Sequence, residues 1–131
     1  MSHPVETSSF IASELSKRGL LYLHVTEPVG SAAAAPVGAQ PATPILRSKF
    51  KGTLIANGGY DLNAAQAAIA NGDADLIAFG VPFLANPDLP LRYRSKAALN
   101  PADQATFYAG EEKGYIDYPA CLLYTSDAAD E

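Results

Sequence analysis

The sequence has a single cysteine, Cys121, no tryptophan and no long apolar run. One cysteine excludes an internal disulfide and a cysteine-based metal cluster. No apolar stretch approaches the roughly 18 residues of a membrane span, and the N-terminus lacks the pattern of a signal peptide. The expectation is therefore a reducing, cytoplasmic setting with no membrane partner.

Basic residues are also scarce. The chain has 9 lysines and arginines against 14 acidic residues, and its formal net charge is −5. No basic run and no basic patch interleaved with aromatic residues is present, so nucleic-acid binding is not expected. The length of 131 residues suits one small domain but falls short of the ~250 residues of a typical (β/α)8 barrel.

The central feature of the sequence is the phrase Leu-Ile-Ala-x-Gly, which occurs at 54–58 and again at 76–80. Each copy is a short apolar run that leads into glycine. Between them, an alanine-rich helical pattern begins at Asp61 and ends at Gly72. Apolar strands that alternate with helices predict a parallel sheet buried on both faces.

Glycines follow both copies where barrel proteins bind ligands. Ligands of a (β/α)8 barrel lie at the carboxyl ends of the strands, and a phosphate commonly binds after strands seven and eight. Gly58, Gly59 and Gly80 would let the backbone approach a phosphate, and the N-terminus of a following helix would favour an anion. The residues alone leave open that these are plain turn glycines.

The remaining patterns predict three strands and about four helices, too few for a closed barrel. Strands are expected at 20–25, 53–56 and 76–79, and helices at 1–18, 44–50, 61–72 and from 86 towards 94. Residues 29–44 are expected to form a mobile loop, and 82–84 a turn. The predicted helix caps are Thr43, Asp61 and Asp88 with Asn86, and the predicted apolar stripes are Phe10, Ile11 and Leu15 on the first helix and Leu62, Ala65 and Ile69 on the third. Arg92 and Arg94 are expected to be solvated.

Four phrases in this order resemble the C-terminal third of the old yellow enzyme family: 19–25 (GLLYLHV), 55–60 (IANGGY), 78–80 (AFG) with 83–89 (FLANPDL), and 107–119 (FYAGEEKGYIDYP). The resemblance implies a partial (β/α)8 barrel over residues 1–120, containing strands six to eight with their helices. It also implies the family's activity, which is FMN-dependent reduction of small activated alkenes with NAD(P)H as the reductant.

The resemblance assigns roles to six residues. Gly58, Gly59 and Tyr60 match the loop after strand seven that binds the FMN phosphate. Gly80 and Val81 match the pair after strand eight, and Tyr108 matches an aromatic on the substrate side of the flavin. The family usually has arginine where this chain has Val81, and valine offers only its amide, so weaker phosphate binding is expected.

No residue matches the family's histidine pair, tyrosine proton donor or flavin-facing arginine, so no catalytic residue is assigned. His3 and His24 do not occupy those positions, Tyr115 and Tyr118 are expected to be packing residues, and no metal site is expected. Residues 121–131 depart from the family's ending and are expected to be a non-native, disordered tail.

Two functional hypotheses follow. The first is an FMN-reductase fragment that is inactive by itself. The second is a half-barrel that self-associates into a homo-oligomer or pairs with a missing N-terminal part. A different phosphate-binding barrel is disfavoured by the aromatic segment 107–119.

Overall fold

The computed structural model describes residues 3–27 and 41–121, which divide into two compact units, Met1–Phe79 and Gly80–Glu131. Most of the loop expected at 29–44, and the tail expected at 121–131 apart from Cys121, lie outside the described residues. The interpretation of residues 1–120 as one barrel segment stays a prediction.

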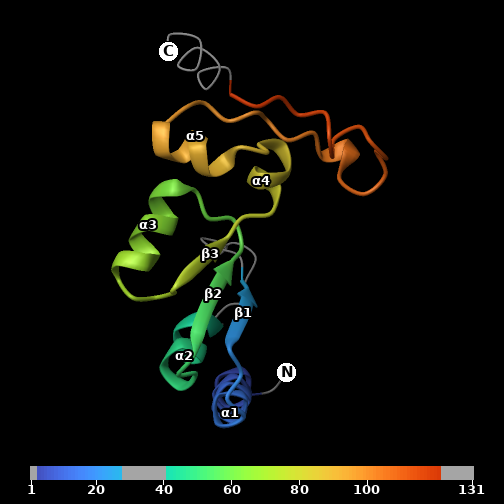
Figure 1. Ribbon diagram of the computed structural model, residues 1–131. Helices are drawn as coiled ribbons and strands as arrows, with labels where there is room; N and C mark the ends of the chain where they lie inside the picture. The colour runs from blue at the N-terminus through green and yellow to red at the C-terminus, as the bar shows by residue number, and fades with distance from the viewer. Residues whose placement is uncertain (1–2, 28–40, 122–131) are drawn as a thin grey trace. The chain divides into compact units, whose positions relative to one another are not determined.

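The first unit is a three-stranded parallel sheet with helices between its strands (Figure 1). The strands pair in the order β1-β2-β3, which is also their order along the chain. The unit consists of α1 (Pro4–Lys17), β1 (Tyr22–Thr26), α2 (Ala42–Lys49), β2 (Thr53–Asn57), α3 (Leu62–Ala70) and β3 (Leu76–Ala78). The predicted parallel α/β alternation is confirmed, as expected for part of a (β/α)8 barrel.

Only one face of this sheet is buried. Side chains alternate between the two faces of a strand, and Leu54 and Ala56 on one face of β2 are fully buried. On the other face, Tyr22 and Leu76 are each about half exposed, and His24 is exposed in the middle of β1. The expectation of burial on both faces is therefore wrong for this chain.

Two local predictions for α3 are confirmed and one is wrong. The Asp61 carboxylate accepts a hydrogen bond from the Ala64 amide at 2.7 Å, which caps the first turn. Gly72 has φ +77°, the left-handed conformation that ends helices. Ala65 is buried as predicted, but Ile69 is 44% exposed and is not part of the buried core.

Two other helices also differ from the prediction. On α1 the buried side chain is Ala12, whereas Phe10 and Ile11 are exposed. The second helix begins at Ala42, and the Thr43 side chain does not cap it.

The second unit contains α4 (Val81–Ala85), α5 (Leu89–Ser95) and a 3-10 turn over Gln104–Thr106. The turn predicted at 82–84 is wrong, because these residues lie in α4. Asn86, predicted to cap the next helix, is instead fully buried: it accepts from the Asn100 amide at 2.7 Å and donates to the Pro82 carbonyl at 2.9 Å. Buried polar groups need such partners.

Arg92 and Asp88 form the buried polar centre of this unit. Asp88 precedes α5 but does not cap it; its carboxylate accepts from Arg92 at 2.7 Å and from the Cys121 amide at 2.7 Å. Arg92 also donates to the carbonyls of Ala98 and Pro119. The prediction of a solvated Arg92 is wrong because the extended segment up to Cys121 returns over α5, whereas Arg94 is exposed as expected.

Candidate functional site

The loop after β2 contains two glycines with positive φ. Gly58 has φ +135° and Gly59 φ +86°, conformations that residues with a β-carbon rarely adopt. No heavy atom lies within 4 Å of the position that a β-carbon at Gly59 would take. The backbone at Gly59 is therefore open to close approach by a ligand.

Gly80 and Val81 begin the second unit directly beyond β3. Gly80 has φ −90°, which is outside the left-handed region that favours glycine. What this position would offer a ligand is open space. No heavy atom lies within 4 Å of its β-carbon position. Val81 is the first residue of α4, and its side chain is half exposed and carries no charge.

Strand pairing relates the starting points of the two loops. Asn57, the last residue of β2, pairs in parallel register with Ala78, the last residue of β3. The chain therefore leaves both strands at the same edge of the sheet. The predicted site residues that follow lie in the two units separately, with Gly58, Gly59 and Tyr60 in the first and Gly80 and Val81 in the second.

The helices that follow these loops add little as anion sites. The first turn of α3 already has an acceptor in Asp61. Helix α4 has five residues, too few for a substantial helix dipole. The donors for an anion would therefore be the loop amides, and not the helix N-termini that the sequence suggested.

Tyr60 follows the two glycines and is partly buried. Burial raises the pKa of its phenol, and the negative charges of Asp73 and Glu27 raise it further. The hydroxyl group therefore stays protonated at neutral pH and can donate a hydrogen bond.

Glu27 and Asn57 connect the strand ends, and neither role was predicted from the sequence. The Glu27 carboxylate accepts from the amides of Ala42 at 2.6 Å and Thr43 at 2.9 Å, and from the Thr43 hydroxyl at 2.6 Å. It thereby caps α2. Although burial alone would raise the pKa of Glu27, these hydrogen bonds hold it below its usual value.

The backbone amide of Glu27 donates to the Asn57 carbonyl at 2.9 Å, and the Asn57 side chain donates from Nδ2 to the Ala78 carbonyl at 2.7 Å. Glu27 follows β1 directly, and Asn57 ends β2. A polar residue at the carboxyl end of each strand was the available sequence signal.

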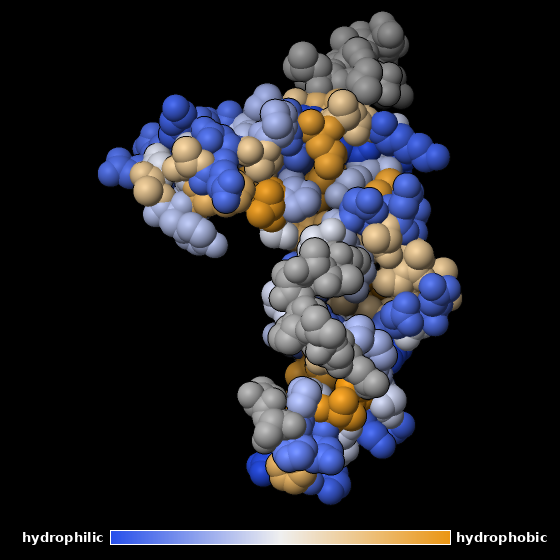
Figure 2. Space-filling model, turned by 180° about the vertical axis from the view of Figure 1, so that it is seen from behind, coloured by the Kyte–Doolittle hydropathy of each residue, from blue (hydrophilic) through white to orange (hydrophobic). Residues whose placement is uncertain are grey.

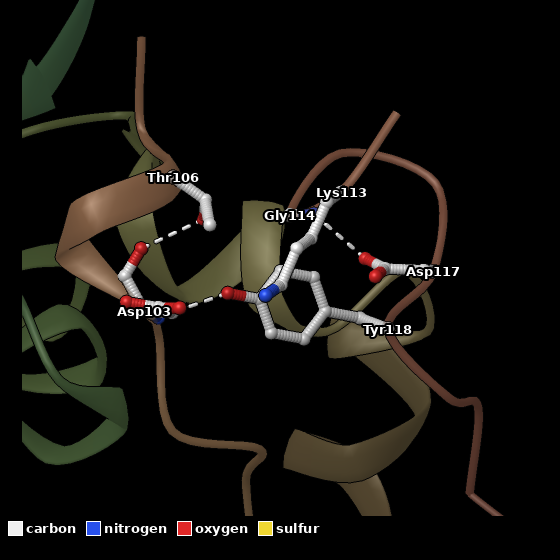
Figure 3. Close-up of a pocket in the computed structure, with 6 residues that line it drawn as sticks. All are labelled: Asp103, Thr106, Lys113, Gly114, Asp117 and Tyr118. Atoms are coloured by element: carbon white, nitrogen blue, oxygen red, sulfur yellow. Dashed lines mark hydrogen bonds between the residues drawn. The ribbon is translucent and has the colours of Figure 1, made fainter. Parts of the chain in front are cut away.

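The second unit contains the predicted Tyr108 and a shallow cavity of about 150 Å³. Tyr108 is 98% exposed and lies outside the residues that line the cavity, which are Asp103, Thr106, Lys113, Gly114, Asp117 and Tyr118 (Figure 3).

Most polar groups around this cavity form hydrogen bonds within the segment that lines it. Asp117 accepts from the Gly114 amide at 2.7 Å, and the Tyr118 oxygen accepts from the Asp103 amide at 2.9 Å. The Tyr115 hydroxyl donates to the Phe107 carbonyl. The structural role predicted for Tyr115 and Tyr118 agrees with these bonds.

The described residues contain neither a candidate metal site nor a helix that could span a membrane. Within 3–27 and 41–121, no three histidine, cysteine or acidic side chains gather in a way that could hold a metal ion. Over the same part of the chain, no helix combines the length and apolar character needed to cross a membrane.

Comparison with known proteins gives a consistent result. Residues 4–100 match the model of the NADH:flavin oxidoreductase / NADH oxidase family. The chain is 48% identical over 113 residues to a 12-oxophytodienoate reductase-like protein of Solanum lycopersicum, covering 86% of this chain and 30% of that protein.

Solved structures show the same likeness. Morphinone reductase in complex with tetrahydroNAD superposes with a TM-score of 0.75 at 47% identity, over 89% of this chain and 30% of that one. The old yellow enzyme from Trypanosoma cruzi gives a TM-score of 0.79 at 29% identity, over 91% and 30%. The chain thus spans about a third of the length of the relatives it matches.

Proposed function

The chain belongs to the NADH:flavin oxidoreductase / NADH oxidase family, the family of the old yellow enzymes, and from this premise we propose that it carries part of a phosphate-binding site for FMN. The observation that carries the proposal is the loop after β2. Gly58 and Gly59 both have positive φ, and the backbone at Gly59 is unobstructed.

In this proposal β1, β2 and β3 correspond to barrel strands six, seven and eight. In the first unit, the amides of Gly58 and Gly59 and the protonated Tyr60 hydroxyl would bind the phosphate. In the second unit, Gly80 and Val81 would each offer a backbone amide. Binding is expected to be weak, since Val81 lacks the guanidinium that would pair with phosphate oxygens. FMN, when bound, supplies the redox chemistry.

For the whole enzyme we propose reduction of activated alkenes with NAD(P)H. A nicotinamide reductant is supported by the relative whose structure contains tetrahydroNAD. Tyr108, almost fully exposed, would be free to contact a small-molecule substrate. The 131 residues by themselves are expected not to turn over, since none matches the family's hydride- and proton-handling positions.

Quenching of FMN fluorescence tests the binding proposal. Titration of FMN with the protein should saturate. Gly80→Asp should weaken FMN binding by about tenfold or more, because a carboxylate would lie close to the phosphate. Asn63→Asp, which adds the same charge on an exposed position of α3, is the matched control. Equal affinities of the two variants would contradict the proposal.

A second function, self-association as a half-barrel, is favoured by the exposed apolar side chains. Leu21 is 81% exposed beside β1, and Phe10 and Leu76 are more than half exposed. Apolar side chains reach the surface in the view of Figure 2 as well. Large exposed apolar patches commonly mark a binding surface.

A further inference from the structure

We propose that Asn57 is a positioning residue that sets the geometry of the Gly58–Gly59 loop and the direction in which the chain leaves β3. The inference rests on the proposed FMN site and names a residue that lies next to it. Asn57 is partly buried and ends β2, directly before Gly58.

Asn57 forms hydrogen bonds to the ends of both neighbouring strands. Its side chain donates from Nδ2 to the carbonyl of Ala78, at the end of β3, over 2.7 Å. Its own carbonyl accepts from the Glu27 amide, directly after β1, at 2.9 Å. One residue therefore connects the carboxyl ends of all three strands.

The bond to Ala78 matters most for the loops. A carbonyl held by a fixed donor fixes the orientation of its peptide plane, here the plane between Ala78 and Phe79. Gly80 is the next residue along the chain. The Asn57 side chain thus controls the direction in which the backbone leaves β3, while the residue's own position fixes the start of the Gly58–Gly59 turn.

Loss of the hydrogen bond from Asn57 to Ala78 should weaken phosphate binding specifically. Loop amides bind an anion well only when they already point to one place, because preorganised donors need no reorganisation on binding. Without the Nδ2 donor, the end of β3 would lose its hydrogen bond to β2, and the peptide plane that leads to Gly80 would no longer be fixed. The loss should fall on phosphate contacts and spare contacts to the isoalloxazine ring.

The test compares FMN with riboflavin, which lacks the phosphate. The native chain is expected to prefer FMN, and Asn57→Ala should reduce the ratio of riboflavin Kd to FMN Kd by about tenfold through weaker FMN binding alone. Asn57→Leu, which keeps the side-chain volume without a donor, should behave in the same way. Asn63→Ala, at an exposed position of α3, should leave the ratio unchanged.

Each outcome has one meaning. A native preference for FMN that survives in both Asn57 variants overturns the role of Asn57 and leaves the phosphate site intact. A native chain with no preference overturns the proposed site and the Asn57 role together. In the free protein, Asn57→Ala should also shift the amide resonance of Gly80, which lies 23 positions away in sequence. Asn63→Ala should not shift it. If the Gly80 resonance does not move in Asn57→Ala, the positioning role is contradicted even if the Asn57 variants bind no flavin.

Discussion

In the proposed site, Val81 would limit the affinity for phosphate. The two loops provide neutral amide donors, whereas an arginine guanidinium adds a positive charge and can bind two phosphate oxygens at once. The Val81 side chain is half exposed, so its replacement disturbs little packing. The position is therefore suited to a gain-of-affinity test.

Val81→Arg should tighten FMN binding by about tenfold to a hundredfold, since hydrogen bonds to charged groups contribute about 1.5–3 kcal/mol. Riboflavin binding should not change, because the added guanidinium pairs with the phosphate only. Titration calorimetry with the two flavins measures both effects. An equal gain for riboflavin would show that the arginine acts elsewhere.

At the scale of single residues, the sequence predicts what depends on near neighbours. Asp61 caps α3 through an amide three residues away, and Gly72 ends the same helix through its own φ. The bond from Asn57 to Ala78 joins residues 21 positions apart, and Glu27 caps a helix from 15 positions away. Such partners are set by the tertiary fold and leave no local pattern.

Within the first unit, Asp75 connects α2 to the sheet. Its carboxylate accepts from the Arg47 guanidinium, with Nη2 to Oδ1 at 3.0 Å, and from the Leu54 amide at 2.8 Å. The hydrogen bond from Arg47 is the largest cause that lowers the pKa of Asp75 to about 2, followed by the bond from Leu54. Asp75 is charged in the folded protein at any pH above this range.

This pKa predicts an acid-dependent loss of stability. A carboxyl group whose pKa is lower in the folded than in the unfolded state stabilises the fold above its ordinary pKa. That contribution should disappear as the pH falls from about 4 through about 2. Urea unfolding across this range should show a smaller decrease for Asp75→Asn than for the native chain. The exposed Glu6→Gln serves as control, and an identical decrease in Asp75→Asn would contradict the account.

Within the second unit, α5 depends on Arg92. Its side chain is 6% exposed and is paired with Asp88 at 2.7 Å. Removal of one partner of a buried ion pair leaves an uncompensated charge and costs about 3–5 kcal/mol. Arg92→Met should destabilise this unit by that amount. Arg94→Met, on the exposed side of the same helix, should stay within about 0.5 kcal/mol.

Thermal and urea unfolding of the two variants, followed by tyrosine fluorescence, measure the difference. Equal stability of Arg92→Met and Arg94→Met would show that the buried pair contributes little.

Helices and strands were predictable where the spacing of apolar residues determined the type of element. The three strands and the parallel pairing follow from short apolar runs that alternate with helices. The prediction that both faces of the sheet are buried was wrong, because burial depends on what covers the sheet and not on the strand sequence. The turn predicted at 82–84 is helical, since Pro82 lies in the first turn of α4, where proline is well tolerated.

For the whole molecule, the open sheet face predicts association. Tyr22, His24 and Leu76 are exposed on strands whose opposite face is packed. Sedimentation velocity should show concentration-dependent oligomers, and Tyr22→Lys with Leu76→Lys, both on this face, should shift the chain towards monomer. A native chain that stays monomeric at 100-fold different concentrations would exclude self-association through this face.

The central proposal is that the loops after β2 and β3 bind a phosphate. The most direct measurement is a titration of the isotopically labelled chain with FMN and with inorganic phosphate, followed by amide chemical shifts. The account predicts that both ligands shift the amides of Gly58, Gly59 and Gly80, with FMN acting at lower concentration. Shifts confined to the cavity around Lys113, or no shifts with either ligand, would contradict it.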